Sequence, residues 1–253
     1  MRVLTDSRGL QARVHLEDGQ RLAFFVSTLE QIAACQVTFS TGSPLTTEEL
    51  GGCGVLAITT RYPEKYAYST AEVTAIQDFV GGGGGLLLMF NHGDLPGSNP
   101  HDMTQYDAII ASQFGIRLES AWFQNPAMGE LSTFNSASFL TGHPILTSGE
   151  KGESVKTIVT HNCSSIFASG RGHALVALPP EMRDLRNGYI PTGRLFVHAL
   201  DGDLTGGGRL VTVAHSGFIG NEETASPGLG LIRHEDNALF IKNVIRWLGR
   251  DQG

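Results

Sequence analysis

The chain has 253 residues, of which 41% are hydrophobic and 17% charged, a composition typical of a soluble globular protein with a sizeable core. Its net charge of −7, with no cluster of Lys and Arg, argues against nucleic-acid binding, which needs basic side chains for phosphate contacts. Three widely spaced cysteines give neither a disulfide framework nor a C-x-x-C zinc pair, so a reducing compartment is the simpler interpretation.

The first residues, MRVLTDSRG, lack the apolar core of a signal peptide, and no apolar run approaches the length of a membrane span. We therefore expect a cytoplasmic protein that does not enter a membrane. No linker composition divides the chain, and residues 1–253 are predicted to form a single domain.

The first part of the chain alternates short apolar runs with helical periodicity. In chain order the pattern predicts a strand at 3–4, a loop over 11–19, a helix over 22–34, a strand at 36–40, a capped helical turn at 46–50 and a strand at 55–58. This alternation is typical of a doubly wound parallel sheet.

The clearest helix starts at Ser69. Ser69 and Glu72 have the spacing of a capping box, an apolar stripe follows, and Gly81 is expected to end the helix. Five glycines then lead into the apolar run 86–90, which suits a strand buried on both faces. The glycines precede a strand, whereas phosphate loops follow one, so they predict a tight reversal of the chain.

The second part is more mixed. It predicts a helix over 101–114, an irregular region over 119–152, strands at 156–159, 165–168 and 174–178, a hairpin of strands 194–199 and 209–214, and a final helix over 237–248 capped by Asp236. The predicted fold class is therefore α/β, with a doubly wound, mostly parallel sheet flanked by helices and a partly antiparallel C-terminal section.

Several segments together resemble the glutamine-amidotransferase-like superfamily. They are the turn 5–9, the helix STAEVTAIQDFV followed by GGGLLL, the segment GHPI at 142–145, and VTVAHSGF followed by DNALF and the final helix. The resemblance is closer to the ThuA-like and the intraflagellar-transport or gliding-motility-like branches. It implies a flavodoxin-like, amidotransferase-like fold over most of the chain.

The same resemblance argues against glutamine hydrolysis. Active members carry a cysteine nucleophile in a G-x-C-x-G turn, and the corresponding turn here contains His92 and no cysteine. His215 is similar in placement to the later histidine of those enzymes, but Gly217 stands two positions on, where they have an acidic residue. The fold is therefore expected to be shared without the activity.

The candidate site follows from the rule that open α/β sheets bind ligands outside the carboxyl ends of their central strands. Asn91, His92 and Asp94 follow one central strand, and His215 and Ser216 follow another. Histidine titrates near neutral pH, so His92 and His215 are candidates for acid and base, with Asp94 orienting His92. The alternatives are that His92 bonds the backbone of its turn and that Asp94 caps the turn.

Four further residues extend this candidate site. Asp6 ends the first strand, and Trp122 and Phe123 could cover a substrate from an irregular loop. Asp236 is either a ligand-binding group or the cap of the last helix. A less favoured alternative is a divalent metal held by nitrogen and oxygen donors from a larger set: His92, Asp94, His101, Asp102 and His215.

Two functions remain open on the sequence. The first is a small-molecule enzyme, a hydrolase or lyase acting on an organic or sugar-like substrate by acid/base chemistry and without a cofactor. The second is a non-catalytic ligand-binding or protein-interaction module. Neither interpretation requires nucleic acid, and the sequence leaves a homo-oligomer open.

Overall fold

The computed structural model describes residues 1–41, 44–61, 67–94, 102–127, 131–147, 153–167, 170–221 and 231–250. Its central sheet has the strand order β10-β5-β8-β11-β12-β4-β3-β1-β2, with β9 paired to β11, and a separate pair is formed by β6 and β7. The strands are β1 (Arg2–Thr5), β2 (Gln36–Phe39), β3 (Val55–Ile58), β4 (Gly85–Met89), β5 (Leu118–Gln124), β6 (Ser132–Phe134), β7 (Ile158–Thr160), β8 (Cys163–Phe167), β9 (His173–Ala177), β10 (Arg183–Asp184), β11 (Arg194–Leu200) and β12 (Leu210–Val213).

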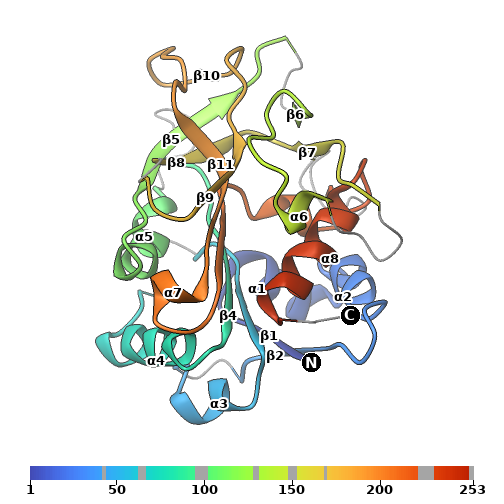
Figure 1. Ribbon diagram of the computed structural model, residues 1–253, viewed down its shortest axis with the longest axis vertical. Helices are drawn as coiled ribbons and strands as arrows, with labels where there is room; N and C mark the ends of the chain where they lie inside the picture. The colour runs from blue at the N-terminus through green and yellow to red at the C-terminus, as the bar shows by residue number, and fades with distance from the viewer. Residues whose placement is uncertain are drawn as a thin grey trace.

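The helices are α1 (Leu10–Asp18), α2 (Ala23–Leu29), α3 (Thr47–Gly51), α4 (Thr70–Gly81), α5 (Thr104–Gln113), α6 (Pro144–Thr147), α7 (Gly202–Thr205) and α8 (Asn237–Leu248). Figure 1 shows α4 and α5 on one side of the central strands and α2 and α8 on the other. The architecture is thus the α/β fold predicted, with helices flanking a largely parallel sheet.

Five neighbouring strands, β12-β4-β3-β1-β2, run parallel. Because all five point the same way, their carboxyl ends meet at one edge of the sheet, and the residues that follow them are brought together there. Beyond β12 the sheet becomes antiparallel, through β11, β8, β5 and β10. The predicted antiparallel C-terminal section is therefore present, and it includes the hairpin of β11 and β12.

The strand β4 lies between β12 and β3 and is fully buried. The glycine run before it permits close backbone contacts. Gly83 has a φ of 106°, which an L side chain rarely adopts, and a Cβ at Gly208 would lie 1.9 Å from the carbonyl oxygen of Gly84. The glycines of the β11–β12 connection therefore pack directly on the glycine run, which acts as a tight reversal as predicted.

Local sequence patterns predicted the bounds of the two long helices, α4 and α8. Ser69 caps α4 with a complete capping box to Glu72, and Gly82 follows the helix. The helix α8 has the predicted bounds, but its N-cap residue, Asp236, makes no side-chain cap bond.

Two predictions on irregular regions are wrong. Residues 11–19 lie largely in α1, which starts where Leu10 N–H donates to the Thr60 carbonyl. The region 119–152 contains the regular elements β5, β6 and α6. The structure of both regions depends on pairing or packing with distant segments, which the hydrophobic periodicity of the sequence does not indicate. Among the described residues, no helix has the length and apolarity that crossing a membrane requires.

Candidate functional site

The carboxyl edge of the parallel strands carries a continuous row of buried polar residues. Its members are Asp6 after β1, Ser40 after β2, Thr59, Thr60 and Arg61 after β3, Asn91 and His92 after β4, and His215 and Ser216 after β12. A row of this kind is uncommon in a core, because burying polar groups is costly unless they are bonded. It divides into a part around the two histidines and a part around Asp6.

His92 is buried and held by its own turn and by Trp122. Its Nδ1 donates to the carbonyl oxygen of Gly93 at 2.9 Å, and its ring stacks on the Trp122 indole with 3.5 Å between centroids. This bond places the proton on Nδ1 and leaves Nε2 as the acceptor. Burial lowers the pKa of His92 to about 4, against a smaller opposing effect of Asp102 and the Gly93 carbonyl. His92 is therefore neutral at pH 7.

His215 is also neutral. Its Nδ1 shares a hydrogen bond of 2.8 Å with Thr160 Oγ1, and its ring centroid lies 6.5 Å from that of His161. Burial lowers its pKa well below 6.5, and positive charge on His92 or His161 would lower it further. His92 and His215 thus follow the neighbouring parallel strands β4 and β12, and the Trp122 ring stacks on His92.

Within the described part of the chain, Trp122 and Ser216 each bury a polar atom that has no hydrogen-bond partner. The atoms are Nε1 of Trp122, the ring stacked on His92, and Oγ of Ser216, the residue after His215. A buried donor or hydroxyl left unbonded costs roughly 1–3 kcal/mol, and a bound ligand or water is the usual explanation. We name His92, His215, Trp122 and Ser216 the histidine site.

Asn91 and Asp94 support this site from its rim. Asn91 Oδ1 accepts from the backbone N–H of His92 at 2.8 Å, and its carbonyl accepts from Thr104 Oγ1. Asp94 is half-exposed and forms an ion pair of 3.2 Å with Arg186. Arg186 had no place in the sequence prediction.

Asp6 belongs to a separate ion-pair network. It is fully buried and pairs with Arg61 and with Arg8, and Arg8 also pairs with Glu72 of the α4 capping box. The Arg61 guanidinium lies 4.1 Å from the centroid of the Tyr68 ring. Asp6 therefore ties β1 to the segments after β3 and to α4.

Asp236 holds the segment before β7. Its carboxylate accepts from the backbone N–H groups of Lys156 and Thr157 at 2.7 and 3.0 Å. It makes no side-chain bond that caps α8. Asp236 thus fixes the approach to β7, the strand whose last residue, Thr160, bonds His215.

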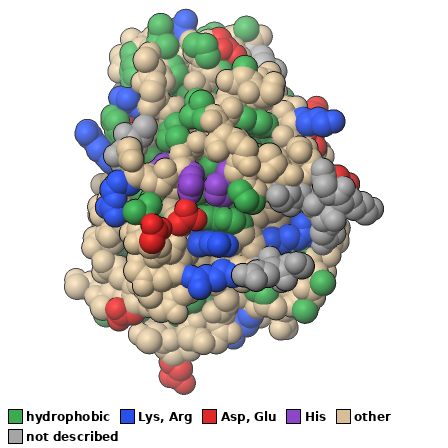
Figure 2. Space-filling model, in the orientation of Figure 1, with side chains coloured by type: hydrophobic (Ala, Val, Ile, Leu, Met, Phe, Trp, Pro, Cys, Tyr) green, Lys and Arg blue, Asp and Glu red, His purple; other side chains and the backbone are tan. Residues whose placement is uncertain are grey.

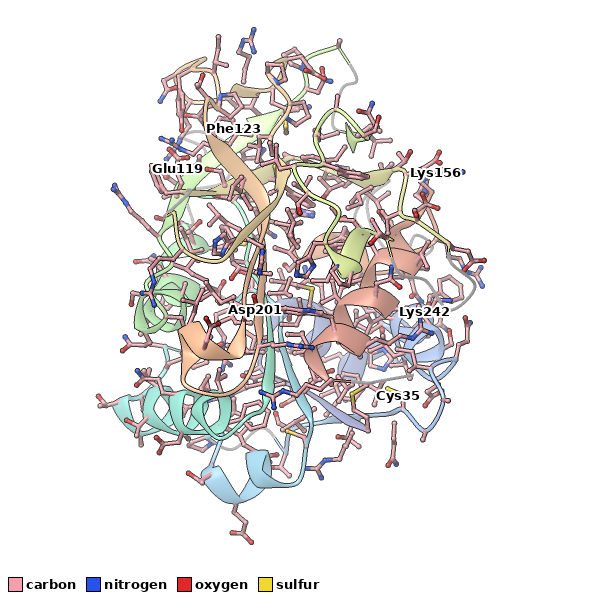
Figure 3. All side chains as sticks on the ribbon, in the orientation of Figure 1. Cys35, Glu119, Phe123, Lys156, Asp201 and Lys242 are labelled. Carbon is pink, nitrogen blue, oxygen red and sulfur yellow. The ribbon has the colours of Figure 1, made fainter. Side chains whose placement is uncertain are left out.

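A second cluster of histidines was missed by the sequence analysis. His173 pairs with Asp201, and the His143 ring lies tilted against that of His173 with 4.8 Å between centroids. Asp201 is labelled in Figure 3, and Figure 2 shows histidines beside acidic and basic side chains in the same part of this face. Burial lowers the pKa of His143 to about 4. The register of β9 and β11, which sequence spacing does not reveal, brings His173 close to Asp201.

Metal binding can be considered only for the described residues, which exclude His101. Among them, no group of three or more His, Cys, Asp or Glu side chains is arranged to hold a metal ion. Of the donors considered from the sequence, His92 and Asp94 are engaged with Gly93 and Arg186.

No protein-family model and no curated protein matches the sequence. Solved structures do match over nearly the whole chain. The N-terminal domain of mmIFT52 superposes with a TM-score of 0.69 at 14% identity, covering 99% of this chain and 98% of that one. A cytoplasmic protein of Salmonella typhimurium LT2 gives 0.63 at 15%, covering 98% and 99%.

A ThuA-like protein of Bacteroides uniformis ATCC 8492 gives a TM-score of 0.57 at 13% identity, covering 98% of this chain and 91% of that one. The chain is thus similar in structure to ThuA-like proteins and to the mmIFT52 domain, the two branches named from the sequence. At these identities the likeness shows the fold alone, and function must be argued from the site.

Proposed function

We propose that the chain binds a small, polar, sugar-like molecule at the histidine site. The observation that carries the proposal is a pair of buried polar atoms with no hydrogen-bond partner among the described residues: Trp122 Nε1, on the ring stacked on the neutral His92, and Ser216 Oγ, next in sequence to the neutral His215. Hydroxyl groups both donate and accept, so they suit a mixture of an N–H donor, a hydroxyl and imidazole acceptors.

The electrostatics favour an uncharged ligand. Both histidines are neutral at pH 7, and the buried charges of Asp6 and Arg61 are paired with each other. An isolated charge placed beside neutral groups in a buried site has no counter-ion to offset its lost hydration. Moving a polyol from water into the site costs less free energy, because its hydroxyls exchange hydrogen bonds to water for hydrogen bonds to the protein.

The test is binding by calorimetry and by thermal shift, using monosaccharides and polyols, with glucuronate as a charged comparison. We expect a neutral sugar or polyol to bind the unaltered chain, and His92→Gln and His215→Gln each to weaken binding about tenfold, because each removes one bond to the ligand, worth roughly 1.4 kcal/mol.

His198→Gln is the matched control. His198 is another buried histidine with a lowered pKa, but it bonds the Arg171 carbonyl from β11. Equal affinity in all three variants would contradict the proposal, as would the absence of binding across the panel.

Acid/base catalysis at the same site is the second candidate. The supporting observation is an electrostatic effect between the two imidazoles: positive charge on His92 lowers the pKa of His215, so the two rings resist carrying a proton at the same time. A pKa near 4 makes His92 a weak base at pH 7, which is why binding is placed first. Turnover of a bound sugar derivative that His92→Gln abolishes, with affinity retained, would favour the enzyme.

A further inference from the structure

The side chain of Arg186, in the loop after β10, lies at the rim of the histidine site, where it contacts Asp94. Its Nη1 lies 3.2 Å from Oδ1 of Asp94, its Nη2 donates to the Ser120 carbonyl, and its Nε lies 3.6 Å from Oδ1 of Asp184. These three partners come from the end of β4, from β5 and from β10. One guanidinium therefore joins three segments that are far apart in sequence.

The same three segments hold the two rings of the stacked pair. The backbone N–H of Trp122 donates to Asp184 Oδ1 at 3.1 Å, and the backbone carbonyl of Trp122 accepts from the Leu185 N–H at 2.8 Å. Gly93 N–H donates to the Ala121 carbonyl at 2.9 Å, which fixes the turn of His92 against β5. Arg186 thus contacts a residue within two positions of each ring.

The turn after β4 packs directly against β5. A Cβ at Gly93 would lie 2.4 Å from Ser120 Oγ and 2.9 Å from the Ser120 carbonyl carbon. An arginine suits this position, because its planar fork donates to several acceptors at once, whereas a lysine presents a single charged centre.

We infer that Arg186 is a positioning residue of the histidine site: by clamping Asp94, Ser120 and Asp184 together it sets the stack of His92 on Trp122. This inference rests on the proposed function for its biological meaning, but the geometry it concerns is present without ligand. Arg186 then controls how far the Trp122 indole is available to a bound molecule.

The chain offers a clean reporter for the test. It has two tryptophans, so Trp247→Phe leaves Trp122 as the single fluorophore. Acrylamide quenching at pH 7 measures the accessibility of Trp122 with no ligand present. In this background we expect Arg186→Gln to raise the quenching constant about twofold, because a site whose supporting contacts are removed loosens by about 1 Å.

A second readout is the pH dependence of Trp122 fluorescence, because a protonated imidazole quenches an indole stacked on it. We expect the transition in Arg186→Gln to move upward by about one pH unit, since a loosened His92 is better hydrated. The charged group that acts on the pKa of His92 is Asp102, and His92 and His161 in turn act on the pKa of His215. Circular dichroism defines the pH range in which each variant stays folded.

Arg186→Lys should recover part of both effects, through the ion pair to Asp94 alone. Arg183→Gln is the control, because Arg183 lies in β10, three residues before Arg186, but donates to the carbonyls of Pro180 and Met182. A folded Arg186→Gln with the quenching constant and transition of its parent would overturn the inference, as would equal changes in Arg183→Gln.

If Arg186→Gln does not fold, Asp94→Asn replaces it, because Asp94 is half-exposed and loses one arm of the clamp. Unchanged Trp122 accessibility in that folded variant would likewise overturn the inference. Sugar binding is measured separately on the same proteins. A changed quenching constant with no sugar binding would support the clamp and count against the proposed function alone.

Discussion

Asp107 is a fully buried carboxyl group of α5 that accepts a hydrogen bond of 2.9 Å from Thr60 Oγ1. Burial raises its pKa to about 8, against the opposing effects of the Thr60 bond and the Arg61 guanidinium. An unfolded aspartate titrates near 3.8, so between pH 4 and 8 the folded chain holds a proton that the unfolded chain has lost. The stability this proton gives is complete below pH 4 and is lost as pH rises through 8.

Asp107→Asn is expected to remove that dependence, because the amide stays neutral and can still accept from Thr60. Relative to the unaltered chain, the variant should gain about 1–3 kcal/mol of unfolding free energy between pH 5.5 and pH 8. Urea unfolding at the two pH values measures the gain. Asp78→Asn, at an exposed position of α4, is the control, and an equal gain there would contradict the assignment to Asp107.

At the same scale, the sequence predicted the strand-end positions of His92, His215 and Ser216 better than the residues that contact them. All three follow strands recognisable from their apolar runs, so the strand-end rule was enough to place them at one edge of the sheet. Thr160 and Arg186 come from the antiparallel section, where register decides which residues meet. No local signal at position 186 distinguishes it from any surface arginine.

At the scale of elements, helix boundaries could be predicted where a local capping motif marks them. The capping box of Ser69 and Glu72 is complete within four residues and fixed the start of α4. The helix α1 has no such signal, since Gly9 provides no side-chain cap and few of its residues are buried. Its first residue is held by the backbone hydrogen bond from Leu10 to Thr60, which follows β3. The polar sequence of 11–19 does not indicate this contact.

The contact between the two glycine segments gives an element-scale prediction. A Cβ at Gly208 would lie 1.9 Å from the Gly84 carbonyl oxygen and 2.6 Å from that of Val80, and neither backbone atom can rotate away. Gly208→Ala should therefore destabilise the fold by about 1–3 kcal/mol, the range for overpacking. Urea unfolding tests this against Gly142→Ala, whose added Cβ would meet nothing within 4 Å. Similar stabilities for the two variants would contradict it.

At the scale of the whole molecule, buried histidines should make the fold sensitive to acid. The pKa values of His92, His143, His198 and His215 are all lowered, chiefly by burial, whereas an unfolded histidine titrates near 6.5. Unfolding therefore takes up protons below pH 6.5. The stability that these neutral rings provide is complete above that pH and is lost as pH falls toward their folded values.

We expect the free energy of unfolding to fall by at least about 2 kcal/mol between pH 7 and pH 5.5, from roughly 1 kcal/mol per histidine less the opposing effect of Asp107. Urea unfolding at a series of pH values measures the slope, and His143→Gln should flatten it without touching the histidine site. A slope unchanged by that substitution would show that His143 is not one of the groups responsible.

The position of β4 has a consequence for how the chain folds. Its partners are β3, which precedes it closely, and β12, which is synthesised last among the strands. Until β12 docks, this apolar strand presents an open edge, the arrangement that favours pairing with another chain. A nascent or truncated chain ending before residue 210 would thus expose an aggregation-prone strand. In the nascent chain, the extent of aggregation would depend on how quickly the β11–β12 hairpin is synthesised and pairs with β4.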